Sequence, residues 1–206
     1  MAQDAAQEAA LSPEIRALAE TWPRALIAEG WGEGLAEWWI LSRARSVAAG
    51  APPFASAQFS SVLGQALFEA RRARRLVRGL EGAEAALAAQ EIGLSQAAAA
   101  QTQSGKPRVS RLLVMSQDGS PRFYHQVDKL QTRFAQRLQV LRLECDEAAL
   151  GYAVFGGGQR ARAVLLDHKA AVLLFLESLI ADVSEGEDAE NSEGPALDAA
   201  DSEGAC

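Results

Sequence analysis

The chain has 206 residues, of which 49% are hydrophobic, and a formal net charge of −7, so it is long enough for one core of ordinary size with flanking segments. The two cysteines, Cys145 and Cys206, lie far apart without a CxxC or Cys/His grouping, which argues against a disulfide framework or a zinc site and favours a reducing, cytoplasmic setting. The acidic amino terminus and the lack of an apolar run approaching ~18 residues argue against secretion and against membrane insertion.

Residues 1–50 are predicted to form a short helical segment that is rich in tryptophan. A helix can begin at Ser12-Pro13, and Pro23 interrupts its apolar pattern and should kink or end it. Four tryptophans fall within residues 22–39, where they form either a packed cluster or an exposed docking surface. We favour the cluster because large aromatic side chains are usually buried.

The segment Gly50-Ala-Pro-Pro53 is a linker and marks the predicted start of an α/β domain over residues 51–181. Strands and helices alternate through this domain with short connections, which predicts a mixed sheet covered on both faces. The fold class we predict is a three-layer α/β/α sandwich with a four-stranded mixed sheet. In chain order we expect a helix from Phe59 to an Arg-rich end, a strand at 76–78, a helix at 81–92, an irregular loop at 93–107, a strand at 111–115, a helix from 121 to about 138, a strand at 140–143, a helix at 146–155, a strand at 163–166 and a helix at 170–180.

Residues 182–206 are predicted to be a disordered acidic tail. They contain nine Asp and Glu residues and no Lys or Arg, and they hold too little apolar surface to order themselves. Without them the chain has 20 basic and 18 acidic residues, so residues 1–181 carry a net charge of +2. The tail either keeps the protein soluble or shields a basic face, and composition does not separate these roles.

Several short motifs occur in the order typical of a known family. They are Ala73-Arg-Arg-Leu-Val-Arg-Gly79, the strand and helix start from Leu112 to Pro121, Leu150-Gly151 before a Gly-rich loop, and the strand Ala163-Val-Leu-Leu-Asp167. Over about residues 56–180 this series resembles the ribosomal protein L-seven-Ae family of kink-turn RNA-binding proteins, in particular its small bacterial YlxQ-like relatives. The resemblance implies binding to structured RNA, including ribosomal RNA.

One departure from the family pattern concerns the residues that recognise kink-turn RNA. Members that bind kink-turns carry Gly-x-Asn-Glu at the start of the second helix, and the matching residues here are Gly79-Leu-Glu81-Gly82. An acid and a glycine cannot make the contacts of the Asn and the Glu, so the sequence leaves open whether strict kink-turn recognition survives.

Arginines and glycines form the candidate RNA-binding site. Guanidinium groups bind phosphate bidentately, and glycines let a backbone approach a ligand closely. The same arginines are equally compatible with a solvated helix end that complements the helix dipole, and the Gly-rich loop with an ordinary helix-to-strand turn. The predicted RNA-binding residues are Arg71, Arg72, Arg74, Arg75, Arg78, Gly79, Glu81, Gly156, Gly157, Gly158, Arg160 and Arg162.

Catalysis is not expected. Ser116, Asp118 and His125 are a conceivable grouping, but the glycines of a nucleophile elbow do not surround Ser116, and Gly156-Gly-Gly-Gln-Arg160 is not a P-loop. We therefore predict no catalytic residues, no metal and no cofactor. The leading hypothesis is a non-catalytic RNA-binding protein, and the alternative is a protein-interaction module on the same fold that docks partners through its tryptophan-rich segment. A small-molecule enzyme of generic α/β type is a third, weaker alternative.

Overall fold

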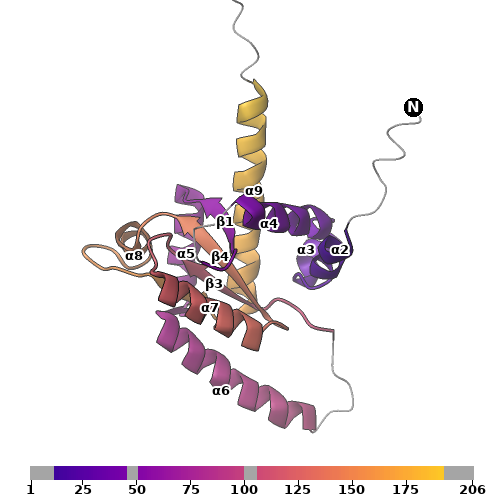
Figure 1. Cartoon of the computed structure of the whole chain (residues 1–206), viewed down its shortest axis with the longest axis vertical. Coiled ribbons are helices and arrows are strands. Elements are labelled where there is room, and N and C mark those ends of the chain that lie inside the picture. Colours follow the sequence, from indigo (N-terminus) through magenta and orange to yellow (C-terminus); the bar gives the residue numbers. More distant parts are fainter. Residues whose placement is uncertain (1–11, 46–50, 100–105, 193–206) are drawn as a thin grey trace, which may run out of the picture.

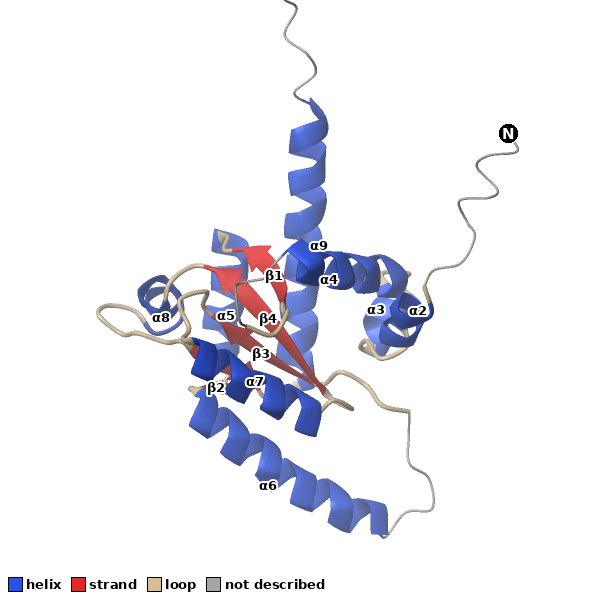
Figure 2. Ribbon diagram, viewed as in Figure 1, coloured by secondary structure: helices blue, strands red, loops and turns tan. Residues whose placement is uncertain are grey.

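The computed structural model describes residues 12–45, 51–99 and 106–192, which form eight helices and one open, mixed sheet of five strands (Figure 2). The predicted mixed α/β class is thereby confirmed. The helices are α2 (Pro13–Ala19), α3 (Arg24–Ala28), α4 (Gly32–Arg45), α5 (Ser61–Arg72), α6 (Leu80–Ala99), α7 (Pro121–Arg133), α8 (Glu147–Phe155) and α9 (Lys169–Ser192). The strands are β1 (Ala55–Gln58), β2 (Leu76–Arg78), β3 (Arg111–Met115), β4 (Leu138–Glu144) and β5 (Ala163–Leu166).

The sheet has the strand order β1-β4-β3-β5-β2. The first three strands are parallel, and β5 and β2 run antiparallel to their neighbours. The prediction of four strands is wrong, because it misses β1. The sequence Ala-Ser-Ala-Gln has neither β-branched residues nor an apolar run, so its extended form depends on pairing with β4, where Ala55 lies opposite Leu141.

Alternate residues of the central strand β3 enter two different hydrophobic clusters, because successive side chains of a strand point to opposite faces. Leu112 and Val114 join the cluster formed with α5, α8 and α9, whereas Leu113 and Met115 join the cluster formed with α6 and α7. Helices therefore pack against both faces of the sheet (Figure 1).

The tryptophan-rich segment contributes to the same core as the sheet. Trp22 and Trp39 are fully buried and meet edge to face at 5.1 Å, in the cluster that also contains Leu141. Pro23 precedes α3 and separates it from α2, as its mid-pattern position predicts. Hydrophobic packing is thus continuous across the predicted boundary at residue 50, although residues 46–50 themselves lie outside the described ranges.

Three predicted element boundaries are wrong. Helix α6 continues to Ala99 where a loop was expected from 93, since its Ala-rich sequence has high helix propensity. Helix α9 continues to Ser192 and projects beyond the sheet, so the predicted disordered tail cannot begin at 182 (Figure 1). Helix α7 ends at Arg133, because buried Leu138 begins strand β4. The remainder of the predicted tail, 193–206, lies outside the described residues.

Candidate functional site

The end of helix α5 divides the arginine-rich run. Arg74 has a φ of 57°, in the left-handed region, and its N–H donates to the carbonyl of Arg71 while that of Arg75 donates to the carbonyl of Ala70. These two bonds form a Schellman motif, which terminates a helix. Arg75 and Arg78 therefore do not continue the helix of Arg71, and the strand predicted at 76–78 follows this turn directly.

Two of the predicted arginines converge on one aromatic ring. The guanidinium carbon of Arg71 lies 5.3 Å from the centroid of Phe155, and that of Arg78 lies 5.0 Å from it. Arg71 also donates to the carbonyl oxygen of Val154 at 3.1 Å. Arg71 comes from α5 and Arg78 from β2, so the ring at the end of α8 joins cations of two different elements.

The Gly-rich loop is held against both α8 and β2. Arg78 donates to the side-chain oxygen of Gln159 at 2.9 Å and to the backbone carbonyl of Arg160. A side chain at Gly151 would not fit, because a β-carbon there would lie 2.6 Å from the Cα of Arg160. Gly156 and Gly158 have positive φ angles of 81° and 73°, which favour glycine. Arg78, a predicted RNA-binding residue, thus lies against the Gly-rich loop.

Glu147 neutralises part of the positive charge that the loop carries. Its two carboxylate oxygens lie 3.3 Å from Arg160 Nη1 and 2.6 Å from Arg162 Nη2. The side chain of Arg160 is 71% exposed and that of Arg162 is 45% exposed, so both cations remain accessible. Glu147 holds them beside the glycines, where a phosphate oxygen would compete for the same guanidinium groups.

Asp118 anchors the beginning of α8 beside this pair. Its carboxylate accepts a hydrogen bond from Ser116 Oγ at 2.6 Å and another from the backbone N–H of Glu147 at 3.1 Å. Burial acts to raise the pKa of Asp118, but these hydrogen bonds and the charge of Arg162 outweigh it, and the pKa lies below its ordinary value. Asp118 is therefore a positioning group that stays ionised at neutral pH.

A groove of about 570 Å³ opens where α6 begins, between that helix end and α7. Four residues that the sequence predicts to bind RNA line this groove: Arg78, Gly79, Glu81 and Arg162. Helix α7 adds Lys129 and Arg133, both exposed, which sequence reasoning missed. Their i, i+4 spacing on the outer face of a predicted helix is the signal that could have revealed them.

The acidic residues of the groove moderate its charge. Glu81 and Glu84 face four cationic side chains among the lining residues, and Glu84 pairs with Arg133 at 3.5 Å. The groove is therefore cationic overall but carries carboxylates that accept hydrogen bonds and repel phosphate.

The remaining arginines do not join this surface. Arg72 pairs with Glu69 on its own helix at 3.5 Å. The carbonyl of Arg75 accepts a hydrogen bond from the N–H of Asp167, at the end of β5 opposite to the Gly-rich loop. Arg74 and Arg75 are exposed near that opposite end, so the structure separates them from Arg78.

Two members of the conceivable grouping of Ser116, Asp118 and His125 are hydrogen-bonded to each other. Ser116 Oγ donates to Asp118, and His125 is exposed on α7. Within the described ranges there is no group of three or more His, Cys, Asp or Glu residues that could hold a metal ion. None of the described helices combines the length and the apolar character that crossing a membrane requires.

Comparison of the chain with protein-family models and with curated proteins finds no match.

Proposed function

We propose that this protein is a non-catalytic RNA-binding protein of the L-seven-Ae, YlxQ-like type, acting in the cytoplasm on structured RNA such as ribosomal RNA. Residues 51–181 would then be a variant of the family's three-layer α/β/α sandwich with one additional edge strand, β1. The order of elements from α5 to α9 agrees with what the sequence resemblance implies.

The observation that supports this function best is the convergence of Arg71 and Arg78 on the ring of Phe155. The adjoining loop contains two glycines with positive φ angles. Stacking on the ring limits the orientations of both guanidinium groups before any ligand binds, which lowers the entropy cost of contacting phosphates. Arg160 and Arg162 extend the same positive surface to the other side of the loop. RNA backbone is the anion that such an extended row of arginines fits best.

A salt titration tests the proposal on the full chain. Fluorescence anisotropy with a labelled hairpin RNA that contains an internal loop should show affinity falling about fortyfold between about 50 and 200 mM salt, if about three phosphates are contacted. Arg78→Ala should reduce the salt slope by about one. Arg24→Ala, at an exposed arginine on α3, is the matched control and should leave the slope unchanged. Absent or salt-independent binding would contradict the proposal.

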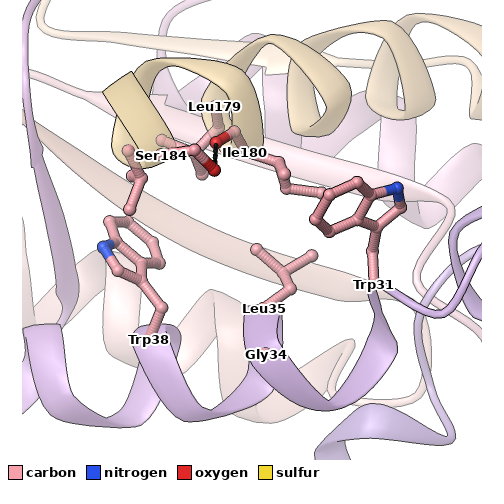
Figure 3. Close-up of a pocket in the computed structure, with 8 residues that line it drawn as sticks. Trp31, Gly34, Leu35, Trp38, Leu179, Ile180 and Ser184 are labelled. Carbon is pink, nitrogen blue, oxygen red and sulfur yellow. Dashed lines mark hydrogen bonds between the residues drawn. The ribbon is translucent and has the colours of Figure 1, made fainter. Parts of the chain in front are cut away.

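A second candidate function is protein interaction through the tryptophan-rich segment. Trp31, Leu35 and Trp38 of this segment face Leu179 and Ile180 of α9 across a small groove of about 180 Å³ (Figure 3). Trp31 is 47% exposed, whereas Trp39 is buried and cannot reach a partner. Partner capture that is lost with Trp31→Ala and retained with Leu41→Ala, at an exposed residue of α4, would favour this function.

A further inference from the structure

A third groove lies between α5 and α8, and three aromatic side chains line it. They are Phe59, Phe68 and Tyr152, and the groove has a volume of about 400 Å³. Tyr152 is 70% exposed, the largest fraction among the exposed large hydrophobic residues of the described chain. The other lining residues, which include Ser60 and Gln65, carry no charge, so the surface can accept a flat, uncharged ring with polar edges.

The groove lies about one helical turn from the arginine pair on Phe155. Tyr152 precedes Phe155 by about one turn of α8, and Phe68 precedes Arg71 by about one turn of α5, so the members of each pair share a helix face. Arg71 spans the two helices by its hydrogen bond to Val154. The aromatic groove and the cationic surface therefore occupy successive turns of the same two helices.

We propose that this groove binds unpaired nucleotides that flank the structured part of the bound RNA, with a base stacked on Tyr152. The inference rests on the proposed RNA-binding function and adds the class of RNA, a folded element with a single-stranded extension. Charge complementarity favours this occupant, because Arg71, one turn beyond Phe68 on α5, could contact the phosphate of a nucleotide bound in the groove. The nearby carboxylate of Glu69 is paired with Arg72 and bonded by Gln65, which reduces its repulsion of that phosphate.

The test compares two RNAs on the full chain by fluorescence anisotropy. One is the hairpin used above, and the other is the same hairpin with about six unpaired uridines added at either end. The extension should raise the affinity about tenfold for the natural chain, since base stacking on an aromatic side chain is sequence-tolerant. Tyr152→Ala should abolish the gain and Tyr152→Phe should retain it. Ile92→Ala, at an exposed residue of α6, should leave it unchanged.

The outcomes separate this inference from the function on which it rests. If both RNAs bind with the same salt-sensitive affinity, the groove does not take nucleotides and the RNA-binding function survives. If neither RNA binds in a salt-sensitive manner, the proposed function fails and the groove inference fails with it. If a second copy of the chain covers the groove, the extension gives no gain and sedimentation shows self-association that Tyr152→Ala removes, which also overturns the inference.

Discussion

The guanidinium group of Arg78 stacks on the ring of Phe155, with 5.0 Å between the guanidinium carbon and the ring centroid. Arg71 uses the same ring from another element at 5.3 Å. Two like charges at one ring repel each other, and the ring's negative faces offset part of that repulsion. A polyanion bound between them would remove the remainder.

The Arg78 and Phe155 contact can be measured by a double-mutant cycle. Arg78→Gln and Phe155→Leu, singly and together, should show a coupling of about 0.5–1 kcal/mol in the free energy of unfolding from urea titrations. The same cycle with Arg72→Gln should be additive, since Arg72 pairs with Glu69 instead. Additivity in both cycles would show that the stacking contributes nothing.

Arg74→Gly should stabilise the protein. Arg74 has a φ of 57°, which costs a residue with a β-carbon about 1 kcal/mol and costs glycine nothing. We expect the midpoint of thermal unfolding to rise by several degrees, about 2–4 °C. Gln65→Gly, at an exposed position inside α5, should lower it by a similar amount because glycine weakens a helix interior. A fall in both variants would mean that the left-handed geometry is not maintained in solution.

Gly151→Ala should destabilise the protein by about 1–3 kcal/mol. The added methyl group would lie 2.6 Å from the Cα of Arg160 and 2.7 Å from the nitrogen of Ala161, and a backbone cannot yield as a flexible side chain does. Gly157→Ala is the matched control, since its β-carbon would meet nothing within 4 Å. Urea unfolding of both variants checks the prediction, and equal stabilities would contradict the close packing of the Gly-rich loop on α8.

Asp118→Asn should lower the free energy of unfolding at pH 7 by about 1 kcal/mol. The effect is this small because Asp118 is exposed and solvent screens part of its interactions. Because the folded pKa of Asp118 lies below its unfolded value of about 3.9, the stabilisation is complete above that pH and is lost as pH falls through the folded pKa. The difference between the two proteins in the free energy of unfolding should therefore shrink below about pH 4. A difference that stays constant into acid would contradict the charge-dependent role.

Cys145 should be unreactive in the folded protein. Burial, with the nearby carboxylates of Asp146 and Asp118, raises the pKa of its thiol to about 12, so almost no thiolate exists at pH 8. Alkylation of Cys145 by iodoacetamide, followed by peptide mapping, should be more than about a hundredfold slower in buffer than in urea. Comparable rates would mean that the end of β4 opens readily.

Local sequence patterns determined the elements whose signals lie within a few residues. Strand β5 matches its prediction residue for residue, since it is a short apolar run with clear ends, and α8 matches except that Asp146 is its cap. Arg78 and the Gly-rich loop, which the sequence assigns to one candidate site, are in contact. The predicted site does not include Lys129 and Arg133, because the periodicity of apolar residues in α7 identifies its buried face and not the cations on its exposed face.

By itself, therefore, the sequence determined the α/β class, most helices and strands, and the concentration of arginine and glycine near residues 71–79 and 156–162. Only the tertiary structure decided which arginines lie near one another, because the left-handed residue Arg74 ends α5 and places Arg75 and Arg78 at opposite ends of β2. It likewise decided that Ala55–Gln58 is a strand, since a segment without intrinsic strand preference becomes extended only when β4 offers its edge. The contacts of Phe155 with Arg71 and Arg78 could not be predicted either. Contacts between residues distant in sequence depend on how the elements pack, and local propensity carries no information about them.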